Sequence, residues 1–257
     1  MNIEEALYKM KAPNERRGPN FGVMQILITT RCDLGNCSNC TQMIPYRKKQ
    51  DMCLRNFEKA LKSVRNYPGI IGIMGGNPCL HKKFREISKI FSNIIPDKKR
   101  RGLWTNNING HGELIQEIYG YFNFNVHGNH KHAKEIIKHI PDARVWGLNV
   151  PSLHGGVLVD MSDVVKREED RWKLIAECDI NQKWSPAMAE IDGQLVGYLC
   201  EVMAAMEQVR FNTSRKNCGF LVEKEPNWWK HPMKKYKKQV ETFCHHCGVP
   251  MRIKGFY

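Results

Sequence analysis

Short apolar segments alternate with amphipathic helical patterns through the first part of this chain, and this alternation restricts the fold more than any other feature. Residues 24–29 and 69–74 are apolar runs that predict buried strands, while residues 56–64 and 84–94 carry apolar side chains at helical spacing. A helix that links two strands returns the chain to its starting edge, so such strands pair in parallel. The sequence therefore predicts a parallel sheet covered by helices.

The alternation continues with a period of about 25 residues, which is typical of a βα barrel. The further strands are expected at residues 103–105, 122–126 and 145–150, and the further helices at residues 113–119 and 133–140. We expect an α/β fold with a partial (βα)6 barrel of the TIM type over residues 21–162, after an N-terminal extension of residues 1–20. In such barrels the functional side chains lie at the carboxyl ends of the strands.

The pattern changes after the barrel region. Residues 163–177 predict a charged helix, and residues 187–191 and 194–199 flank Asp192-Gly193, a dipeptide that favours a tight antiparallel hairpin. The remainder is short-helix and loop material that contains further cysteines. Residues 163–257 are therefore expected to form a small α+β, cysteine-rich domain.

Ten cysteines are many for a chain whose N-terminus carries no apolar signal segment. The sequence also contains no run of about 18 apolar residues, the length that a membrane span requires. We expect a cytoplasmic protein, and in that reducing compartment clustered cysteines bind metal more often than they form disulfides.

The chain carries 40 Lys and Arg against 26 Asp and Glu, a net charge of +14. The basic excess lies in residues 82–101 and in the C-terminal part, where lysines alternate with Trp228, Trp229 and Tyr236. Basic residues among aromatic ones can hold phosphates and stack bases, so nucleic acid is a candidate partner. A solvated helix surface is the favoured interpretation, because no fold-specific nucleic-acid motif accompanies the charge.

Three cysteines, Cys32, Cys37 and Cys40, follow the first strand in a polar loop. Structural zinc normally takes four protein ligands, so these three thiolates alone do not form such a site. Three thiolates do suit a 4Fe–4S cluster, in which they bind three irons and leave the fourth open. The loop is thus expected to hold a cluster with one free coordination position.

Residues 29–40, 51–61 and 72–81 together resemble the radical S-adenosylmethionine (SAM) superfamily. They correspond in order to its cluster loop, its first helix and its GGEP-type loop. The resemblance implies that SAM chelates the open iron and is reductively cleaved to a deoxyadenosyl radical, which takes a hydrogen atom from a small-molecule or peptide substrate. It also implies an electron donor, either a reductase or a protein of the flavodoxin or ferredoxin type.

The resemblance further implies which residues contact SAM. The first cysteine gap holds four residues instead of three, Asn39 stands in place of an aromatic residue, and Asn77 stands in place of an acidic one. Asn77 can still accept a hydrogen bond from the SAM ammonium through its carbonyl oxygen. The expected SAM-binding residues are Gly75, Gly76, Asn77, Pro78, Asn39, Asn106, His127 and Asn149.

A second set of cysteines lies in the C-terminal region: Cys178, Cys200, Cys244 and Cys247, with Cys218 as an alternative ligand. Four thiolates suit either zinc or an iron–sulfur cluster. Beside a radical-SAM-like core, this order resembles the twitch or SPASM appendage that holds an auxiliary 4Fe–4S cluster. Chain length and cysteine spacing look most like the inosamine dehydrogenases of aminoglycoside biosynthesis.

These patterns predict a radical SAM enzyme in which an auxiliary cluster assists oxidation or binding of the substrate. A dehydrogenase and a peptide- or small-molecule-modifying enzyme both fit this prediction. The alternative from a different class is a non-enzymatic module, stabilised by zinc or iron–sulfur groups, that binds nucleic acid.

Overall fold

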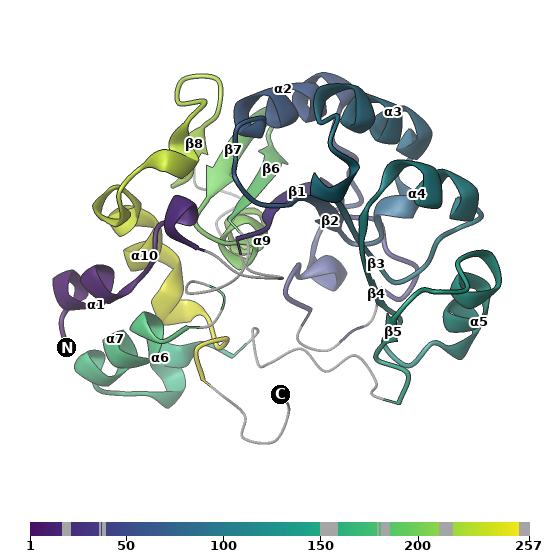
Figure 1. The fold of residues 1–257 in the computed structure, drawn as a ribbon. Helices are drawn as coiled ribbons and strands as arrows, with labels where there is room; N and C mark the ends of the chain where they lie inside the picture. The colour runs from purple at the N-terminus through teal and green to yellow at the C-terminus, as the bar shows by residue number, and fades with distance from the viewer. Residues whose placement is uncertain are drawn as a thin grey trace.

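A computed structural model of the protein describes residues 1–16, 22–35, 37, 40–149, 159–178, 180, 186–210 and 218–251. An eight-stranded sheet in the order β5-β4-β3-β2-β1-β6-β7-β8 forms its centre (Figure 1). β1 therefore lies inside the sheet, with the N-terminal strands on one side and the C-terminal strands on the other.

The N-terminal half of the sheet is parallel throughout. Its strands are β1 (Met24–Thr29), β2 (Ile71–Gly75), β3 (Arg101–Thr105), β4 (Tyr121–Asn125) and β5 (Val145–Trp146). The connecting helices are α2 (Leu54–Val64), α3 (Phe84–Ile94), α4 (Gly112–Ile118) and α5 (His130–His139). The predicted fold class, an α/β sheet of the partial-barrel type, is confirmed.

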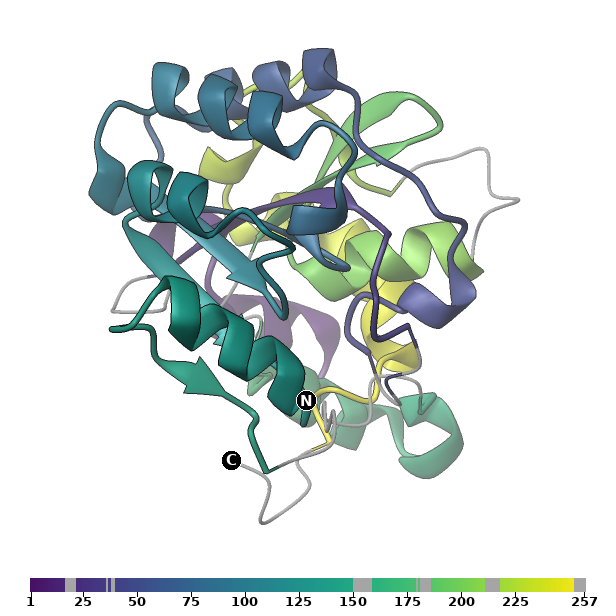
Figure 2. The same ribbon diagram turned by 90° about the vertical axis from the view of Figure 1, so that its right-hand side faces the viewer.

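Side-chain burial explains this alternation. Every residue of β1 is buried, as expected for a parallel strand covered on both faces. The helices α2 to α5 form an outer layer over the parallel strands, and α9 (Glu201–Arg210) lies on the other side of the sheet (Figure 2). Within the outer layer Phe57 of α2 meets Phe91 of α3 edge to face, with ring centroids 6.1 Å apart.

The C-terminal strands extend the same sheet. β6 (Ala187–Ile191) pairs in parallel with β1, and β7 (Gln194–Tyr198) returns antiparallel to β6 and pairs with β8 (Phe220–Leu221). The turn between β6 and β7 uses Asp192 and Gly193 at positive φ, as the sequence predicts. The domain boundary at residue 163 stays a prediction. In the sheet, β6 of the expected C-terminal domain is hydrogen-bonded to β1 of the expected barrel.

The predicted helix 163–177 is divided into α6 (Met161–Val164) and α7 (Glu168–Ala176). The break has a local cause: the Arg171 guanidinium donates from one nitrogen to the carbonyls of Val165 and Lys166, at 2.8 Å each. These bonds satisfy carbonyls that a continuous helix would have used in its own ladder.

The chain ends pack beside these helices. The helix α1 (Ile3–Lys9) begins at an Asn2 capping box and contacts α7. The C-terminal segment contains α10 (Lys237–Phe243) and three short 3-10 helices, η5 (Trp228–Lys230), η6 (Met233–Tyr236) and η7 (Cys244–His246). The other 3-10 helices are η1 (Pro13–Glu15), η2 (Ile44–Tyr46), η3 (Pro78–Leu80) and η4 (Lys98–Arg100).

The aromatic residues of the basic C-terminal segment belong to the core. Trp228, Trp229 and Tyr236 are each at most 3% exposed, so their faces cannot stack on bases. Arg101, in the other basic segment, is also buried and donates to the carbonyls of Ile118 and Ile95. These contacts weaken the case for a nucleic-acid surface.

In the described part of the chain, every helix is too short or too polar to cross a bilayer.

Candidate active site

A cavity of about 300 Å³ opens at the carboxyl ends of the parallel strands. The three cysteines Cys32, Cys37 and Cys40 all line it, and the helix α9 closes one side with Glu201. Its further lining residues are Gln25, Leu34, Thr41, Gln42, Ile44, Met74, Gly75, Gly76, Trp104, Thr105, Asn106, Asn123, Asn125 and His127. The position agrees with the rule that ligands of βα folds bind at this edge of the sheet.

Backbone contacts hold the cysteine loop against the end of β2. The Gly76 amide donates to the Thr29 carbonyl at 2.9 Å, and the Asn77 amide donates to the Arg31 carbonyl at 2.6 Å. A Cβ atom on Gly76 would lie 2.1 Å from the Arg31 oxygen and 3.1 Å from the Cys32 Cβ. Gly76 is thus required so that the loop carrying Cys32 can lie directly on β2.

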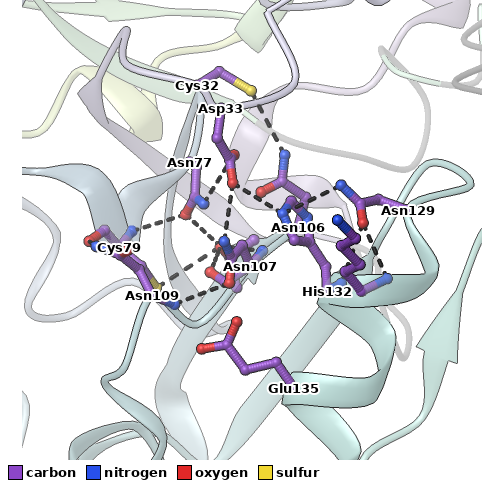
Figure 3. Close-up of polar contacts among 12 residues, drawn as sticks. Cys32, Asp33, Asn77, Cys79, Asn106, Asn107, Asn109, Asn129, His132 and Glu135 are labelled. Atoms are coloured by element: carbon purple, nitrogen blue, oxygen red, sulfur yellow. Dashed lines mark hydrogen bonds and ion pairs between the residues drawn. The ribbon is translucent and has the colours of Figure 1, made fainter.

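The Asp33 carboxylate connects this loop to two strand ends and a helix (Figure 3). It accepts from the Asn77 Nδ2 at 3.3 Å and from the Asn107 Nδ2 at 2.9 Å, and it lies 3.2 Å from the His132 Nε2. These contacts come from the ends of β2 and β3 and from α5. Sequence reasoning missed Asp33 and His132 as positioning residues, although the place of Asp33 directly after Cys32 was a usable signal.

Asn77 follows the end of β2, is fully buried and is not among the residues that line the cavity. Its Oδ1 accepts from the Cys79 amide at 3.0 Å and from the Thr105 hydroxyl at 2.7 Å. These bonds occupy the oxygen that was expected to accept from SAM. Pro78 is likewise buried and is not part of the cavity lining. SAM contacts by Asn77 and Pro78 stay predictions.

The other residues that were expected to contact SAM do not all lie at the cavity. Asn106 lines the cavity and donates from Nδ2 to the Cys32 Sγ at 3.5 Å, and His127 lines it with a positive φ of 48°. Asn149 is exposed and is not among the lining residues. Asn39 lies outside the described residues. The structure thus brings Asn106 and His127, but not Asn149, to the cavity that the cysteines line.

Carboxamides dominate the polar lining of the cavity. They come from Gln25, Gln42, Asn106, Asn123 and Asn125. The Oε1 of Gln25, the Oδ1 of Asn106 and both amide atoms of Gln42 are buried and form no hydrogen bond within the described structure. Buried polar atoms are nearly always paired, so unpaired ones in a cavity indicate a ligand that supplies their partners.

Burial also affects the thiols of the cysteine loop. Burial raises the pKa of the Cys40 thiol, and the charge of Cys32 raises this pKa further. Hydrogen bonds from the backbone amides of Ile44 and Gln42 act in the opposite direction and lower the pKa. Burial lowers the pKa of the Arg47 guanidinium to about 10, and the charge of Cys40 opposes this effect. Arg47 also donates to the Gln42 carbonyl at 3.2 Å and to the Gln208 Oε1 at 2.8 Å. A cation close to Cys40 favours its thiolate form, which is the form that binds metal.

The C-terminal cysteines line a second cavity, which is narrow, with a volume of about 20 Å³. Cys178, Cys200, Cys244 and Cys247 all line it, between apolar side chains that include Met206 and Phe243. Cys218 is not part of this lining, and its thiol lies 3.5 Å from the Thr242 hydroxyl. The four residues predicted as one ligand set are therefore neighbours in the fold.

Burial controls the protonation of this second set. It raises the pKa of Cys200 to about 12 and raises the pKa of Cys247 well above its ordinary value. The charges of Cys178 and Cys200 raise the Cys247 pKa further, as expected for thiols that face one another. Four soft donors in a dry cavity fit a metal group that stabilises their thiolate forms.

Neither set converges tightly on one point. Within the described ranges, no three Cys, His, Asp or Glu side chains form a group suited to a single metal ion. The cysteines instead surround a common cavity in each case.

The start of α9 connects the two cavities. Cys200 lines the narrow cavity, and the next residue, Glu201, lines the large one. Consecutive residues of the chain thus line the two cavities at this point. A group held by Cys200 and a ligand beside Glu201 would be neighbours.

No protein-family model matches the sequence, and no curated protein matches it significantly. The structure is similar to that of BtrN in complex with AdoMet and 2-DOIA, with a TM-score of 0.57 over 90% of this chain and 94% of that chain. Sequence identity in this alignment is 11%, so the likeness is one of fold. A structure of BtrN in an open conformation aligns over 91% of this chain and 89% of that chain, with 12% identity and a TM-score of 0.48.

Proposed function

We propose that this chain is a radical SAM enzyme that oxidises a small, hydroxyl-bearing molecule. One observation carries the proposal: Cys32, Cys37 and Cys40 line a single cavity together with Gly75, Gly76, Asn106 and His127, which the sequence resemblance had assigned to SAM. The fold is shared with BtrN, a protein whose structure contains AdoMet and 2-DOIA.

In this proposal Cys32, Cys37 and Cys40 hold the SAM-binding 4Fe–4S cluster. When bound there, the cluster would supply the electron that cleaves SAM to methionine and a deoxyadenosyl radical. The chain's own residues position the reactants: the Asn106 amide donates to the Cys32 sulfur, and Asp33 fixes the loop to β2 and β3. The electron itself is expected from a reductase or a flavodoxin- or ferredoxin-type protein.

The cavity lining supports a small, uncharged or cationic substrate. Gln25, Gln42 and Asn106 carry buried amide oxygens that lack partners in the described structure, and hydroxyl or amino groups of a ligand can donate to them. Lys and Arg side chains are absent from the described lining, which disfavours phosphorylated or nucleic-acid substrates.

Glu201 supplies a base for the oxidation. Conversion of an alcohol carbon to a carbonyl removes one hydrogen atom, one proton and one electron. The deoxyadenosyl radical takes the hydrogen atom from carbon, and the Glu201 carboxylate, which lines the cavity, accepts the hydroxyl proton. Cys178, Cys200, Cys244 and Cys247 would hold an auxiliary group that could accept this electron, and Cys200 directly precedes Glu201 in the chain.

The experiment is a metal and product assay on protein purified without oxygen. The proposal expects brown protein with about eight irons, enough for two 4Fe–4S clusters, and formation of deoxyadenosine from SAM after chemical reduction. The control variant Cys53→Ala should keep the iron content and the deoxyadenosine yield of the wild type, because Cys53 is exposed and lies outside both cavities. Colourless protein that contains zinc alone would contradict the proposal and favour the metal-stabilised binding module.

A further inference from the structure

Two glycines shape the sheet surface under the large cavity. Register pairing forms one row across β1, β2, β3 and β4, which consists in this order of Gln25, Gly72, Gly102 and Tyr121. Register partners point their side chains to the same face of a sheet. Because the two middle residues of the row have no side chain, the row leaves a gap between the glutamine and the tyrosine.

The indole of Trp104 fills this gap. A Cβ atom on Gly72 would lie 2.3 Å from the Trp104 Cζ3, and a Cβ atom on Gly102 would lie 2.4 Å from the same atom. Tyr121 stacks beside the indole, with ring centroids 5.2 Å apart and an angle of 28° between the rings. Trp104 is half-buried and lines the cavity, whereas Gly72, Gly102 and Tyr121 do not. The two glycines therefore allow an aromatic ring to lie across the sheet as part of the cavity floor.

Carboxamides flank this ring. The same Cβ atom on Gly72 would lie 2.8 Å from the Gln25 Oε1, so the Gln25 amide and the indole meet above Gly72. Asn123 is the register partner of Trp104 on β4, and it lines the cavity as Gln25 does. Gln25 is 1% exposed, and its Oε1 forms no hydrogen bond within the described structure. The terminal torsion of a glutamine is broad, so either end of this amide can turn toward a ligand.

This floor lies deeper in the barrel than the cysteine loop. Gln25 precedes Thr29, the last residue of β1, by four positions, which is about 13 Å of extended chain. The loop that carries Cys32 begins only after Thr29. The indole and its flanking amides are therefore available to a ligand other than the metal group of that loop.

We propose that Trp104 and Gln25 determine which substrate the enzyme accepts: the indole carries an apolar C–H face of a polyol, and the Gln25 amide hydrogen-bonds with a hydroxyl or amino group at the edge of that face. The inference rests on the proposed function, because it places the substrate of that reaction on this floor. The face of an aromatic ring carries partial negative charge, which attracts the weakly positive hydrogens on carbons that bear hydroxyl groups.

The flat indole also favours one shape of polyol. A ring polyol presents its C–H face in one rigid arrangement, whereas an open-chain polyol must be ordered before it can cover the same surface. Aromatic walls with a few fixed polar groups are typical of pockets that orient a small ligand. Ring polyols should therefore bind more tightly than open-chain polyols of the same composition class.

The test is saturation-transfer NMR on holoenzyme reconstituted without oxygen, with SAM present. The probes are 2-DOIA, the small molecule in the BtrN structure, and a matched pair of polyols, the ring myo-inositol and the open-chain sorbitol. Irradiation of aromatic protein protons should saturate the C–H protons of bound myo-inositol, which should bind more tightly than sorbitol. Trp104→Leu should remove this transfer and weaken myo-inositol binding about tenfold, while Trp104→Phe should retain most of both. Trp146→Leu is the matched control, because Trp146 is exposed and lies outside the cavity lining.

Two further variants keep the inference testable if Trp104→Leu folds poorly. Gln25→Leu should weaken myo-inositol binding about tenfold, because a polar group of the ligand loses its partner. Gln194→Leu, which changes an exposed glutamine at the start of β7, is its control. Gly72→Ala should also weaken binding, although Gly72 does not line the cavity, because the added Cβ displaces the Trp104 ring. In all these variants the affinity for SAM, measured by calorimetry, should change far less than the affinity for myo-inositol.

The outcomes separate this inference from the proposed function. Wild-type affinity for the probes in Trp104→Leu or in Gln25→Leu would overturn the inference, as would equal affinities for myo-inositol and sorbitol. Failure of all three probes to bind wild type would overturn it as well, and so would an equal loss of SAM affinity in Trp104→Leu, which would assign the floor to SAM. None of these results affects the iron content or the deoxyadenosine yield on which the radical SAM assignment depends. Protein that binds myo-inositol through Trp104 but contains no iron would instead contradict the proposed function alone.

Discussion

The two cysteine sites use the same donor atom in opposite surroundings. Cys32, Cys37 and Cys40 are half-buried and line a cavity of about 300 Å³ with amide walls. Cys178, Cys200, Cys244 and Cys247 are each 5% to 8% exposed and surround a space of about 20 Å³ between apolar side chains. The first site has room for a ligand beside its thiols, whereas the thiols of the second are buried around a narrow space, and we call the two the open and the closed site.

This difference indicates that the two cysteine sites have different roles. An open site with unpaired amide oxygens suits binding and conversion of a small molecule. A closed apolar site suits a group that exchanges electrons without exchanging ligands, since its surroundings exclude water. Removal of either set of thiols should therefore affect different steps of the same reaction.

The largest expected effect is on the open site. Replacing Cys32, Cys37 and Cys40 together by Ala should abolish deoxyadenosine formation, because no other residues of that loop can hold the cluster. The protein should stay largely folded, since these residues are not part of the hydrophobic core. Deoxyadenosine yield by chromatography measures the effect. Cleavage of SAM at the wild-type rate in the triple variant would end the assignment of this site.

The closed site should respond differently. In Cys244→Ala/Cys247→Ala the iron content should fall by about half, the share of one of two 4Fe–4S clusters, while deoxyadenosine still forms. Oxidation of the substrate should stop, because its electron has no acceptor. 2-DOIA, the small molecule bound to BtrN, is the first compound to test. A variant that keeps all its iron, loses zinc and no longer melts cooperatively would instead identify a zinc site that stabilises the fold.

A smaller effect, on the stability of the fold, is expected from a change at Asn77. Asn77→Glu should destabilise the protein by about 1–3 kcal/mol, because the longer side chain breaks two buried hydrogen bonds and brings a second carboxylate close to Asp33. Urea denaturation checks this, with calorimetric titration of SAM in parallel. If the Asn77 side chain instead contacted SAM, a glutamate would tighten SAM binding and leave stability unchanged.

The smallest expected effect is a pH dependence of stability that comes from the buried His81. The His81 Nδ1 accepts from the Lys83 amide at 3.0 Å, and its Nε2 lies 2.9 Å from the Met52 carbonyl. Burial lowers the pKa of His81 in the folded state, so the unfolded chain binds the proton more readily. Stability should fall as pH drops below about 6.5, the ordinary histidine value, toward the lowered folded pKa.

His81→Gln tests this dependence. The variant should lose part of the acid sensitivity that wild type shows in thermal melts between pH 7 and pH 5, since glutamine does not titrate. His130→Gln, which changes an exposed histidine at the start of α5, is the matched control. Identical pH profiles for wild type and His81→Gln would mean that His81 does not contribute.

Local patterns were sufficient to predict the order of the elements. Apolar periodicity records which side chains are buried, so residues 24–29 and 84–94 were recognised as β1 and α3. The Asp192-Gly193 turn was predictable because only a few residue types tolerate positive φ at both positions. The spacing of Cys32, Cys37 and Cys40 was informative because one short loop carries all three.

The sequence by itself thus determined the α/β alternation, the hairpin and the open cysteine site, all of which depend on residues close together in the chain. Only the tertiary structure decided that Asp33 binds Asn107 and the His132 side chain, that the Asn77 oxygen is already occupied, and that Arg16 donates to the Leu199 carbonyl. It also decided that the consecutive residues Cys200 and Glu201 line different cavities. These contacts join residues far apart in the chain, and their formation depends on how the helices and strands pack rather than on any local preference.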